Sequence, residues 1–221
     1  MNTEIKAFVF DVYGTLFNVH SVKEKADELY PTKGDEISRL WRQKQLEYSF
    51  LRQLMGKYEP FWKITEDSLR YTINSLKLEL SIEKINTLME SYLHLSPYPE
   101  VEEVLSQLKS KTLAVFSNGS HDMLNPLIKN SGLSSIFSEL ISVDDRKQYK
   151  PTPAAYHYVL ERLNLERREI LFMSSNGWDI SGARAFGFQT AWINRNQLPN
   201  EELGLRPHSI FPDLRGMLTK I

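Results

Sequence analysis

Polar side chains that could bind or convert a small ligand follow three apolar stretches of this sequence, at the point where each stretch ends. They belong to Asp11, Thr15, Ser117, Asn118, Ser174, Asn176 and Asp179. Asp11 is the most informative, because packing does not require a carboxylate directly after a buried apolar run and an unpaired buried charge is costly. The motif Asp-x-x-Gly-Thr alone is equally compatible with a plainer interpretation, in which Asp11 caps the next turn.

The apolar stretches have the composition of buried β-strands. Residues 6–10, 112–117 and 169–173 are short and apolar and contain many β-preferring side chains, which is typical of strands covered on both faces of a sheet. Open α/β sheets bind ligands at the carboxyl ends of parallel strands. If these strands belong to one such sheet, the polar clusters can converge at one edge. Lys150 sits in the loop before a further predicted helix.

Residues 17–96 show helical periodicity and no convincing strand. Four helices are predicted there, and the residues that start them are Ser21 with Glu24 as a capping box, Asp35, Thr65 with Ser68, and Ser81. Their ends are predicted near Tyr30, Gly56, Leu76 and Tyr92. Pro97 and Pro99 close this block, which we expect to be an insertion that covers the carboxyl edge of the sheet.

From residue 100 onward, strands alternate with helices. The predicted helices span residues 101–108, 120–132 and 153–163, with a further one that ends near Phe186. The predicted strands span residues 112–117, 137–143, 169–173 and 189–193, the last being the final core strand. This alternation favours a parallel sheet with helices on both faces. The expected fold is α/β, with a doubly wound, mostly parallel sheet in a Rossmann-like core (residues 1–16 and 97–221) and an inserted all-helical cap subdomain (residues 17–96).

The composition is that of an ordinary globular chain and excludes several classes of function. The 221 residues are 41% apolar and 25% charged, and the net charge of −1 offers no electrostatic footprint for nucleic acid or an anionic membrane. The absence of cysteine excludes disulfides, thiolate nucleophiles and cysteine-ligated metals. No signal peptide and no stretch long enough to span a bilayer is evident, so we expect a cytoplasmic protein.

Two classes of enzyme find little support in the residue pattern. The five histidines, His20, His94, His121, His157 and His208, fall outside the polar clusters. This arrangement argues against a hydrolase built on a serine and a histidine. No glycine-rich phosphate loop is present, which argues against nucleotide binding.

The order of the motifs resembles that of a known group of proteins. The motifs are Asp-x-x-Gly-Thr at residues 11–15, Ser-Asn-Gly at 117–119, Lys-Pro at 150–151 and an acidic loop at 174–179. Together they resemble the haloacid dehalogenase-like superfamily over almost the whole chain. In that superfamily the first aspartate is a nucleophile that forms an ester with the substrate, and the resemblance implies this role for Asp11.

Two departures from the phosphatases of the superfamily argue against metal-dependent phosphoryl transfer. Phosphatases carry a second aspartate two residues after the nucleophile, where this sequence has Tyr13. They also carry an acidic pair after the later strand, where this sequence retains only Asp179. A hard dication prefers several anionic oxygen ligands, and Lys150 would compete for the carboxylates of Asp11 and Asp179. We therefore expect neither a metal nor another cofactor.

The same departures resemble one subgroup, the L-2-haloacid dehalogenases. Further agreement is found at Trp41-Arg42-Gln43 with Tyr48, at Met55-Gly56 with Phe61-Trp62, at Lys150-Pro151 with Tyr156, and at residues 174–179. The resemblance implies that Asp11 attacks the α-carbon of an L-2-haloalkanoic acid, expels halide and forms an ester. An activated water would then hydrolyse the ester without a metal and release a D-2-hydroxyalkanoic acid.

The resemblance assigns catalytic roles to a set of polar residues. They are Asp11, Thr15, Lys150, Ser174, Asn176 and Asp179. Lys150 would pair with Asp11 and keep it ionised and aimed. Asp179, helped by Ser174 and Asn176, would position and activate the water that attacks the ester carbonyl. The plainer alternatives are a helix cap for Asp179 and a solvated loop side chain for Lys150.

A second set of residues is implied to bind the substrate or the halide. They are Tyr13, Arg42, Phe61, Ser117, Asn118, Tyr156 and Trp178. Arg42 and Asn118 would donate to the departing halide, and Ser117 with Thr15 would hold the substrate carboxylate. The plainer alternatives are a surface arginine for Arg42, a helix cap for Ser117 and core packing for the aromatic side chains.

Two other functions remain open at this point. One is a phosphatase-type hydrolase on the same fold, which Tyr13 and the loop at residues 174–179 disfavour. The other is a catalytically inactive binding member, which the intact charged residues disfavour. The expected partners are a small 2-haloalkanoate substrate and the halide product, with no nucleic acid and no membrane. The exposed face of the helix that carries Arg42 could also support a homodimer, as the resemblance implies.

Overall fold

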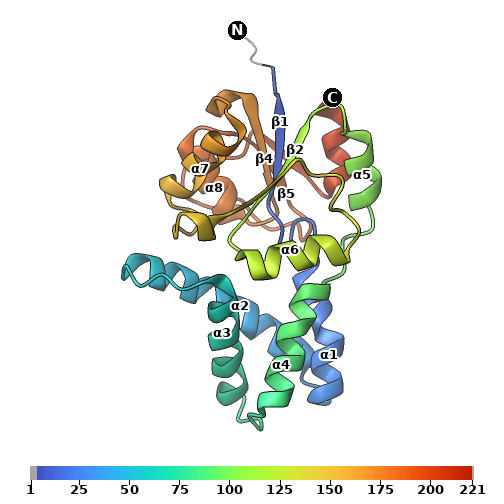
Figure 1. Cartoon of the computed structure of the whole chain (residues 1–221), viewed down its shortest axis with the longest axis vertical. Helices are drawn as coiled ribbons and strands as arrows, with labels where there is room; N and C mark the ends of the chain where they lie inside the picture. Colours follow the sequence, from blue (N-terminus) through green and yellow to red (C-terminus); the bar gives the residue numbers. More distant parts are fainter. Residues whose placement is uncertain (1–3, 221) are drawn as a thin grey trace.

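The computed structural model describes residues 4–220 and has a single six-stranded sheet at its centre, in which every pair of neighbouring strands is parallel (Figure 1). The strands are β1 (Ala7–Phe10), β2 (Thr112–Ser117), β3 (Glu139–Ser142), β4 (Ile170–Ser174), β5 (Gln189–Ile193) and β6 (Ser209–Phe211). Their order across the sheet is β3-β2-β1-β4-β5-β6. β1 therefore lies between β2 and β4, so the three strands that precede the polar clusters are neighbours.

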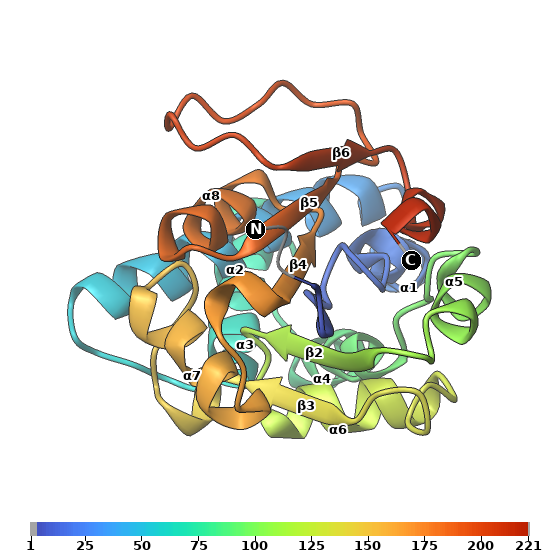
Figure 2. The same ribbon diagram turned by 90° about the horizontal axis from the view of Figure 1, so that it is seen from above.

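Helices cover both faces of this sheet. They are α5 (Val101–Gln107), α6 (His121–Asn130), α7 (Pro153–Leu163) and α8 (Gly177–Phe186). Figure 2 shows α7 and α8 on one side of the sheet and α5 on the other. Parallel strands need such crossover connections. The predicted doubly wound α/β fold is confirmed.

Four further helices lie between β1 and α5 in the chain. They are α1 (Val22–Leu29), α2 (Gly34–Leu54), α3 (Phe61–Ser75) and α4 (Ile82–Ser91). Figure 1 shows them grouped beyond the end of the sheet toward which β1 runs. Two backbone hydrogen bonds join the segments that enter and leave this group, from Asn18 N–H to the Ser96 carbonyl at 2.9 Å and from Tyr98 N–H to the Leu16 carbonyl at 3.0 Å. The division into a core and a cap at residues 16 and 97 stays a prediction.

α3 begins earlier than the sequence predicts. Its first residue is Phe61 rather than Thr65, and extended backbone at Pro60 precedes it. The Thr65 hydroxyl donates to the Phe61 carbonyl at 2.7 Å, so it bonds within the helix and does not cap it. The predicted start at Thr65 is therefore wrong.

The first two helices also begin without the predicted caps. The Ser21 hydroxyl donates to a backbone carbonyl three residues earlier at 2.8 Å, so no capping box with Glu24 forms. α2 begins at Gly34, and Asp35 lies inside its first turn. Ser81, in contrast, caps α4 as predicted, because its hydroxyl accepts a backbone N–H of the first turn at 3.4 Å.

β6 pairs with β5 at one edge of the sheet and is not predicted from the sequence. It has only three residues, and none of them is fully buried. Since an edge strand of this kind lacks the continuous apolar run of the inner strands, the pattern that identifies buried strands misses it. Residues 189–193 form β5 and are the last buried strand, as predicted, and β6 adds an edge strand that is not predicted.

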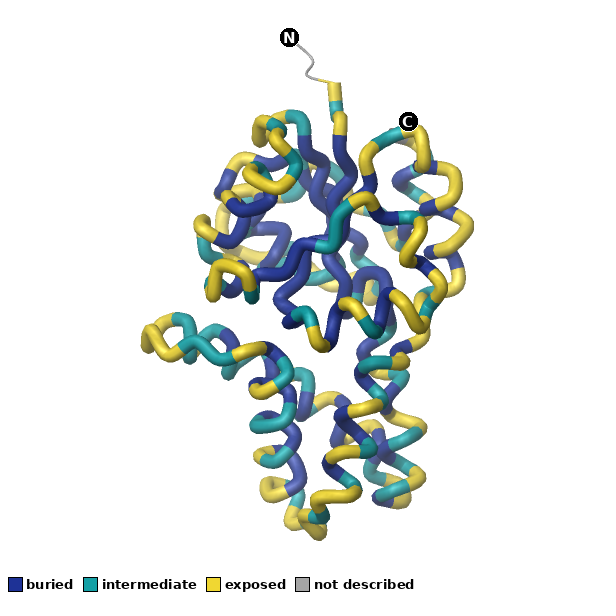
Figure 3. The backbone as a smooth tube through the Cα atoms, viewed as in Figure 1, coloured by how far each residue is buried: buried dark blue, intermediate teal, exposed yellow. Residues whose placement is uncertain are grey.

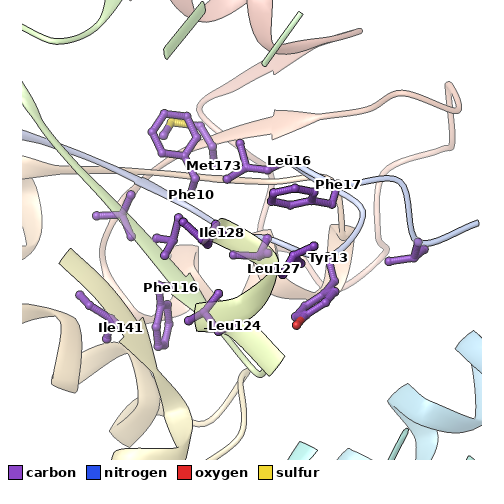
Figure 4. Packing of buried hydrophobic residues seen from close by; sticks show 14 of the residues in the cluster. Phe10, Tyr13, Leu16, Phe17, Phe116, Leu124, Leu127, Ile128, Ile141 and Met173 are labelled. Carbon is purple, nitrogen blue, oxygen red and sulfur yellow. The ribbon is translucent and has the colours of Figure 1, made fainter. Parts of the chain in front are cut away.

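The core fills the space between the sheet and its helices. In Figure 3 the central strands are largely buried, and exposed residues lie on the outer sides of the helices and in the loops. Figure 4 shows Leu124, Leu127 and Ile128 of α6 directed toward Phe116 and Ile141 of the sheet. The spacing of three and four residues places one apolar face of α6 against the strands.

α2 is a long helix of 21 residues. It carries Arg42 near its middle and ends in Leu51, Leu54 and Met55, the last of which follows the final helical turn. All three apolar side chains are exposed. Neither α2 nor any other helix within residues 4–220 combines the length and apolar character needed to cross a membrane.

Candidate active site

The ends of β1, β2 and β4 bring the predicted polar clusters together. In the register of the sheet, Phe10 lies beside Met173, so Asp11 and Ser174 leave the sheet next to each other. β2 ends at Ser117 on the other side of β1. The carboxyl edge of a parallel sheet is where such folds bind ligands.

Lys150 lies between two buried carboxylates. Its ammonium nitrogen is 2.8 Å from Asp11 Oδ1 and 2.7 Å from Asp179 Oδ2. The Lys150 side chain is 1% exposed, that of Asp11 is 6% exposed and that of Asp179 is 0% exposed. A third bond runs from the ammonium to the Phe116 carbonyl at 3.2 Å, which completes the three donors of the lysine. The loop before α7 thus delivers Lys150 to the site and does not leave it in solvent.

Burial and charge act in opposite directions on this trio. Burial alone would lower the pKa of Lys150, but the carboxylates of Asp11 and Asp179 raise it above its usual value. Burial raises the pKa of Asp179, an effect that the Lys150 charge opposes and the Asp11 charge reinforces. Tyr156 donates to Asp179 Oδ1 at 2.7 Å and to the Asp179 carbonyl at 3.0 Å. Hydrogen bonds from Lys150 and Tyr156 therefore fix the Asp179 carboxylate, and its raised pKa makes it a stronger base. Its side chain does not cap α8.

The second oxygen of Asp11 faces a group of donors. Oδ2 accepts from Thr15 Oγ1 at 2.8 Å, from Asn176 Nδ2 at 3.0 Å and from Ser174 Oγ at 3.4 Å. Thr15 Oγ1 in turn accepts the Ser175 N–H at 2.8 Å. Because donors hold both oxygens, the orientation of the Asp11 carboxylate is fixed. Asp11 does not cap a turn.

Arg42 reaches from α2 to the loop that follows β1. Its Nη2 donates to the Tyr13 carbonyl at 3.2 Å and its Nη1 donates to Gln45 Oε1 at 2.7 Å. Arg42 borders a cavity of about 300 Å³, which Asn176 and Trp178 also line. The guanidinium is thus part of the site rather than of the free helix surface.

Two buried donors at the β2 end have no hydrogen-bond partner among residues 4–220. They are the side-chain amide nitrogen of Asn118 and the hydroxyl of Tyr13. Asn118 Oδ1 accepts the Lys150 N–H at 2.9 Å, and Ser117 Oγ accepts the Gly119 N–H at 2.9 Å. Burial raises the pKa of Tyr13, so its hydroxyl remains a donor. Because an unsatisfied buried donor is costly, the pair indicates a ligand that brings acceptor atoms.

The two aromatic residues expected to wall the pocket occupy different positions. Trp178 borders the cavity and packs edge-on against Phe50 of α2, with ring centres 5.1 Å apart. Phe61 is buried behind Tyr13 and Tyr149, with ring centres 6.0 Å apart in both pairs. Trp178 can therefore contact a ligand in the cavity, whereas Phe61 supports the Tyr13 ring.

Several residues that contact the site cannot be recognised, or can hardly be recognised, from the sequence. Ser175 acts through its backbone N–H and Phe116 through its carbonyl, so their side-chain types give no indication. Gln45 lies three residues after Arg42 on the same helix face, and this spacing could have identified it. His20 borders the cavity, although it falls outside the polar clusters of the sequence.

The described residues also define what the site offers to a metal ion. Within residues 4–220, no group of three or more histidine, aspartate or glutamate side chains is placed to hold one. Asp11 and Asp179 are the two buried carboxylates of the site, and the Lys150 ammonium lies between them. The positive charge next to both carboxylates is thus that of a lysine of the chain itself.

Comparison with known proteins decides the family. The family model described as haloacid dehalogenase-like hydrolase matches residues 5–187, which is most of the chain. The chain belongs to the haloacid dehalogenase-like hydrolase family. The resemblance drawn from the motifs is thereby confirmed, as is the class of fold.

Named relatives within this family match over nearly their whole length. Haloacetate dehalogenase H-2 from Moraxella sp. (strain B) is 47% identical over 95% of this chain and 94% of its own. (S)-2-haloacid dehalogenase 2 from Pseudomonas sp. (strain CBS-3) is 46% identical over 96% of this chain and 93% of its own. The L-2-haloacid dehalogenase structure from Xanthobacter autotrophicus with chloropropionic acid covalently bound has a TM-score of 0.90 and 39% identity, covering 97% of this chain and 96% of that one.

Proposed function

We propose that this chain hydrolyses L-2-haloalkanoic acids to D-2-hydroxyalkanoic acids and halide. The observation that carries the proposal is the Asp11 carboxylate, which Lys150 holds at one oxygen and Thr15 and Asn176 hold at the other. An oriented, desolvated carboxylate is a competent nucleophile. The names of the relatives support the same reaction, and the Xanthobacter structure carries chloropropionic acid bound covalently.

The first step is a displacement at the α-carbon. An Asp11 oxygen forms a bond to this carbon while the carbon–halogen bond breaks, and the halide leaves with the bonding electron pair. Attack from the side opposite the halogen inverts the configuration. Arg42 and the side-chain amide nitrogen of Asn118 donate to the departing halide, since both offer N–H groups and Arg42 stays charged.

The second step is hydrolysis of the ester. Asp179 takes a proton from a water molecule, whose oxygen bonds to the Asp11 carbonyl carbon. The bond from this carbon to the hydroxyacid oxygen then breaks, and that oxygen receives the proton from Asp179. The second proton of the water leaves the Asp11 carboxyl group for solvent, which restores the carboxylate. Ser174 and Asn176 help to position the water, and Tyr156 orients Asp179. The α-carbon is untouched in this step, so the inverted configuration is retained in the product.

The substrate carboxylate needs donors of its own. We assign this role to Ser117 and the backbone N–H groups of the first loop, together with the Tyr13 hydroxyl that has no partner among residues 4–220. The Thr15 hydroxyl, for which the resemblance implies the same role, already donates its proton to Asp11 Oδ2. Phe61 supports the Tyr13 ring, and Trp178 forms one wall of the space for the substrate.

We expect the proposed reaction to need no metal, because the Lys150 ammonium lies within hydrogen-bond distance of both carboxylates, Asp11 and Asp179. Treatment with a chelator followed by dialysis should leave the release of chloride from L-2-chloropropanoate unchanged. A requirement for Mg²⁺, or faster hydrolysis of p-nitrophenyl phosphate than of the haloacid, would favour a phosphatase of the same fold instead.

We also propose how the molecule is organised around the site. Residues 17–96 form a cap over the carboxyl edge of the sheet and supply Arg42 to it. A second copy of the chain covers the exposed apolar end of α2, where Leu51, Leu54 and Met55 lie. The cytoplasmic location expected from the sequence stays a prediction.

A single turnover in ¹⁸O water, with enzyme in excess over L-2-chloropropanoate, tests the mechanism. Label should enter the Asp11 carboxylate, as measured by mass spectrometry of its peptide, and should be absent from the D-2-hydroxypropanoate. Asp11→Asn should form no product, since an amide is a poor nucleophile. Label in the product, or retained configuration, would mean that water attacks the substrate directly and that Asp11 is not the nucleophile.

A further inference from the structure

The chain crosses between the sheet and the group α1–α4 at two segments, residues 14–18 and 96–100. The two backbone hydrogen bonds described above hold these segments side by side. We call them the crossing pair. The first of them contains Thr15 and begins just after the candidate nucleophile, so the position of the crossing pair bears directly on the site.

Arg195, two residues after the end of β5, contacts both segments of the crossing pair. Its Nη2 donates to the Thr15 carbonyl at 2.8 Å, and its Nη1 lies 2.7 Å from Glu100 Oε1. The guanidinium carbon is 3.6 Å from the centre of the Tyr98 ring. The side chain is only 12% exposed and borders the same cavity as Arg42. A planar guanidinium can make these three contacts at once.

Thr15 connects Arg195 to Asp11. The Thr15 carbonyl accepts from Arg195, while the Thr15 hydroxyl donates to Asp11 Oδ2 at 2.8 Å and accepts the Ser175 N–H at 2.8 Å. Because carbonyl and hydroxyl belong to one residue, a shift of the carbonyl moves the hydroxyl. Arg195 is therefore one residue away from a direct contact with the nucleophile.

We propose that Arg195 is a positioning residue, which fixes Thr15 against the segment 96–100 and so keeps Asp11 aimed at the substrate. This inference rests on the proposed function and extends it to a residue outside every motif considered above. Arg195 does not touch the reacting atoms. Its loss should therefore slow ester formation and leave substrate affinity unchanged, since a displacement of about 1 Å at a reacting group can cost about 100-fold in rate.

The test compares variants with matched charge. Glu100 is buried, so removal of Arg195 alone would leave an uncompensated carboxylate and destabilise the fold. Glu100→Gln removes the carboxylate and leaves the contacts of Arg195 to Thr15 and Tyr98. Glu100→Gln combined with Arg195→Met removes the guanidinium as well. Arg167→Met is the control, because Arg167 also lies over an aromatic ring and donates to a backbone carbonyl, but away from the site.

The measured quantity is the rate constant for alkylation of Asp11 at saturating L-2-chloropropanoate. Rapid quench and mass spectrometry of the Asp11 peptide give the alkylated fraction at each time. Glu100→Gln and Arg167→Met should stay within about threefold of the unmodified chain, and the double variant should be at least about tenfold slower. The thermal midpoints of Glu100→Gln and the double variant should agree. Arg195→Lys, which keeps a cation beside Glu100, should also be slow because an ammonium cannot make all three contacts.

Equal alkylation rates in Glu100→Gln and the double variant, or full activity in Arg195→Lys, would overturn the positioning role. A raised KM at an unchanged rate constant would overturn it too, and would show that Arg195 attracts the anionic substrate. Absence of alkylation in the unmodified chain would refute the proposed function instead. The two failures are thus distinguishable.

Discussion

Asp11 and Asp179 are buried carboxylates that share one lysine, yet their surroundings differ. Asp11 accepts from Lys150 and from side-chain donors on its other oxygen, which fix its direction. Asp179 accepts from Lys150 and Tyr156, and burial raises its pKa. Environments that differ in this way assign different tasks to similar groups. In the proposed mechanism, Asp11 attacks carbon and Asp179 accepts a proton.

The raised pKa of Asp179 predicts that the ester accumulates in acid. Asp179 must be ionised to accept a proton, and burial moves its pKa above the usual 3.8. As the pH falls through this raised pKa, hydrolysis should slow, while the Lys150 ammonium stays charged because its own pKa is raised. The alkylated fraction of Asp11 during steady turnover, measured by mass spectrometry after quenching, should therefore rise as the pH is lowered.

Asp179→Asn provides the comparison for this pH dependence. Its alkylated fraction should be high and should not change with pH, because the group that titrates is gone. If the alkylated fraction of the unmodified chain stayed level or fell toward acid pH, Asp179 would not be the base for the second step.

Arg42→Lys tests the proposed role of the Arg42 guanidinium in binding the departing halide. The ammonium keeps the charge but loses the planar set of donors that reaches Tyr13, Gln45 and a leaving group together. Halide release should fall at least about tenfold, which corresponds to about 1.4 kcal/mol of transition-state stabilisation. Arg39→Lys is the matched control, since Arg39 lies on the same helix and pairs with Asp35 in solvent. Near-normal activity of Arg42→Lys would return Arg42 to the role of a surface residue.

At the scale of elements, the turn after β1 depends on Gly14. Its φ of +93° is one that side chains rarely adopt, and an added Cβ would lie 3.1 Å from Ser175 Oγ. Gly204 has a φ of +71° with open space around it, so it shares the backbone requirement without the contact. Gly14→Ala and Gly204→Ala should each lose about 1–2 kcal/mol of unfolding free energy from the backbone alone.

Only the first of these variants should affect chemistry. Gly14 precedes Thr15, so a displaced turn would move the Thr15 hydroxyl, which donates to Asp11 Oδ2. Alkylation of Asp11 by L-2-chloropropanoate should therefore slow in Gly14→Ala, whereas Gly204→Ala should react normally. Chemical denaturation and the alkylation rate measure the two effects separately. Equal rates in both variants would show that the turn tolerates the shift.

The sequence predicts the inner strands and the starts of α4 to α7 well, but the starts of α1, α2 and α3 poorly, for physical reasons. β1, β2, β4 and β5 are covered on both faces, so their continuous apolar runs identify them. Ser21 and Thr65 have the residue types of caps but donate to nearby carbonyls instead. β6 escapes prediction because a short, partly exposed edge strand has no such run.

At the scale of the whole molecule, the sequence anticipates the residues at the strand ends but not the contacts between distant segments. Asp11, Ser117 and Ser174 follow from where buried strands end. The bond from Arg42 to the Tyr13 carbonyl and the contacts of Arg195 depend on how α1–α4 and the β5–β6 loop pack against the first loop. Sequence spacing carries no measure of this packing.

The exposed end of α2 is a feature of the whole molecule, because it lies where the helix extends beyond its neighbours (Figure 1). Leu54 and Met55 are 84% and 62% exposed, and Leu51 adjoins them one turn earlier. Contiguous exposed apolar side chains commonly mark an interaction site. In a twofold dimer the same patch of each copy contacts that of the other, so one patch per chain is enough to bury the exposed apolar side chains of both copies.

Leu54→Glu should convert this proposed dimer to a monomer, because two carboxylates would face each other across an apolar contact. Sedimentation equilibrium of both proteins measures the change, with the thermal midpoint of the monomer as a check on folding. Ile82→Glu is the control, since Ile82 is 72% exposed at the start of α4, away from the patch. The unmodified chain and Ile82→Glu should both sediment as dimers. A monomeric unmodified chain, or a dimeric Leu54→Glu, would show that the end of α2 does not hold two copies together.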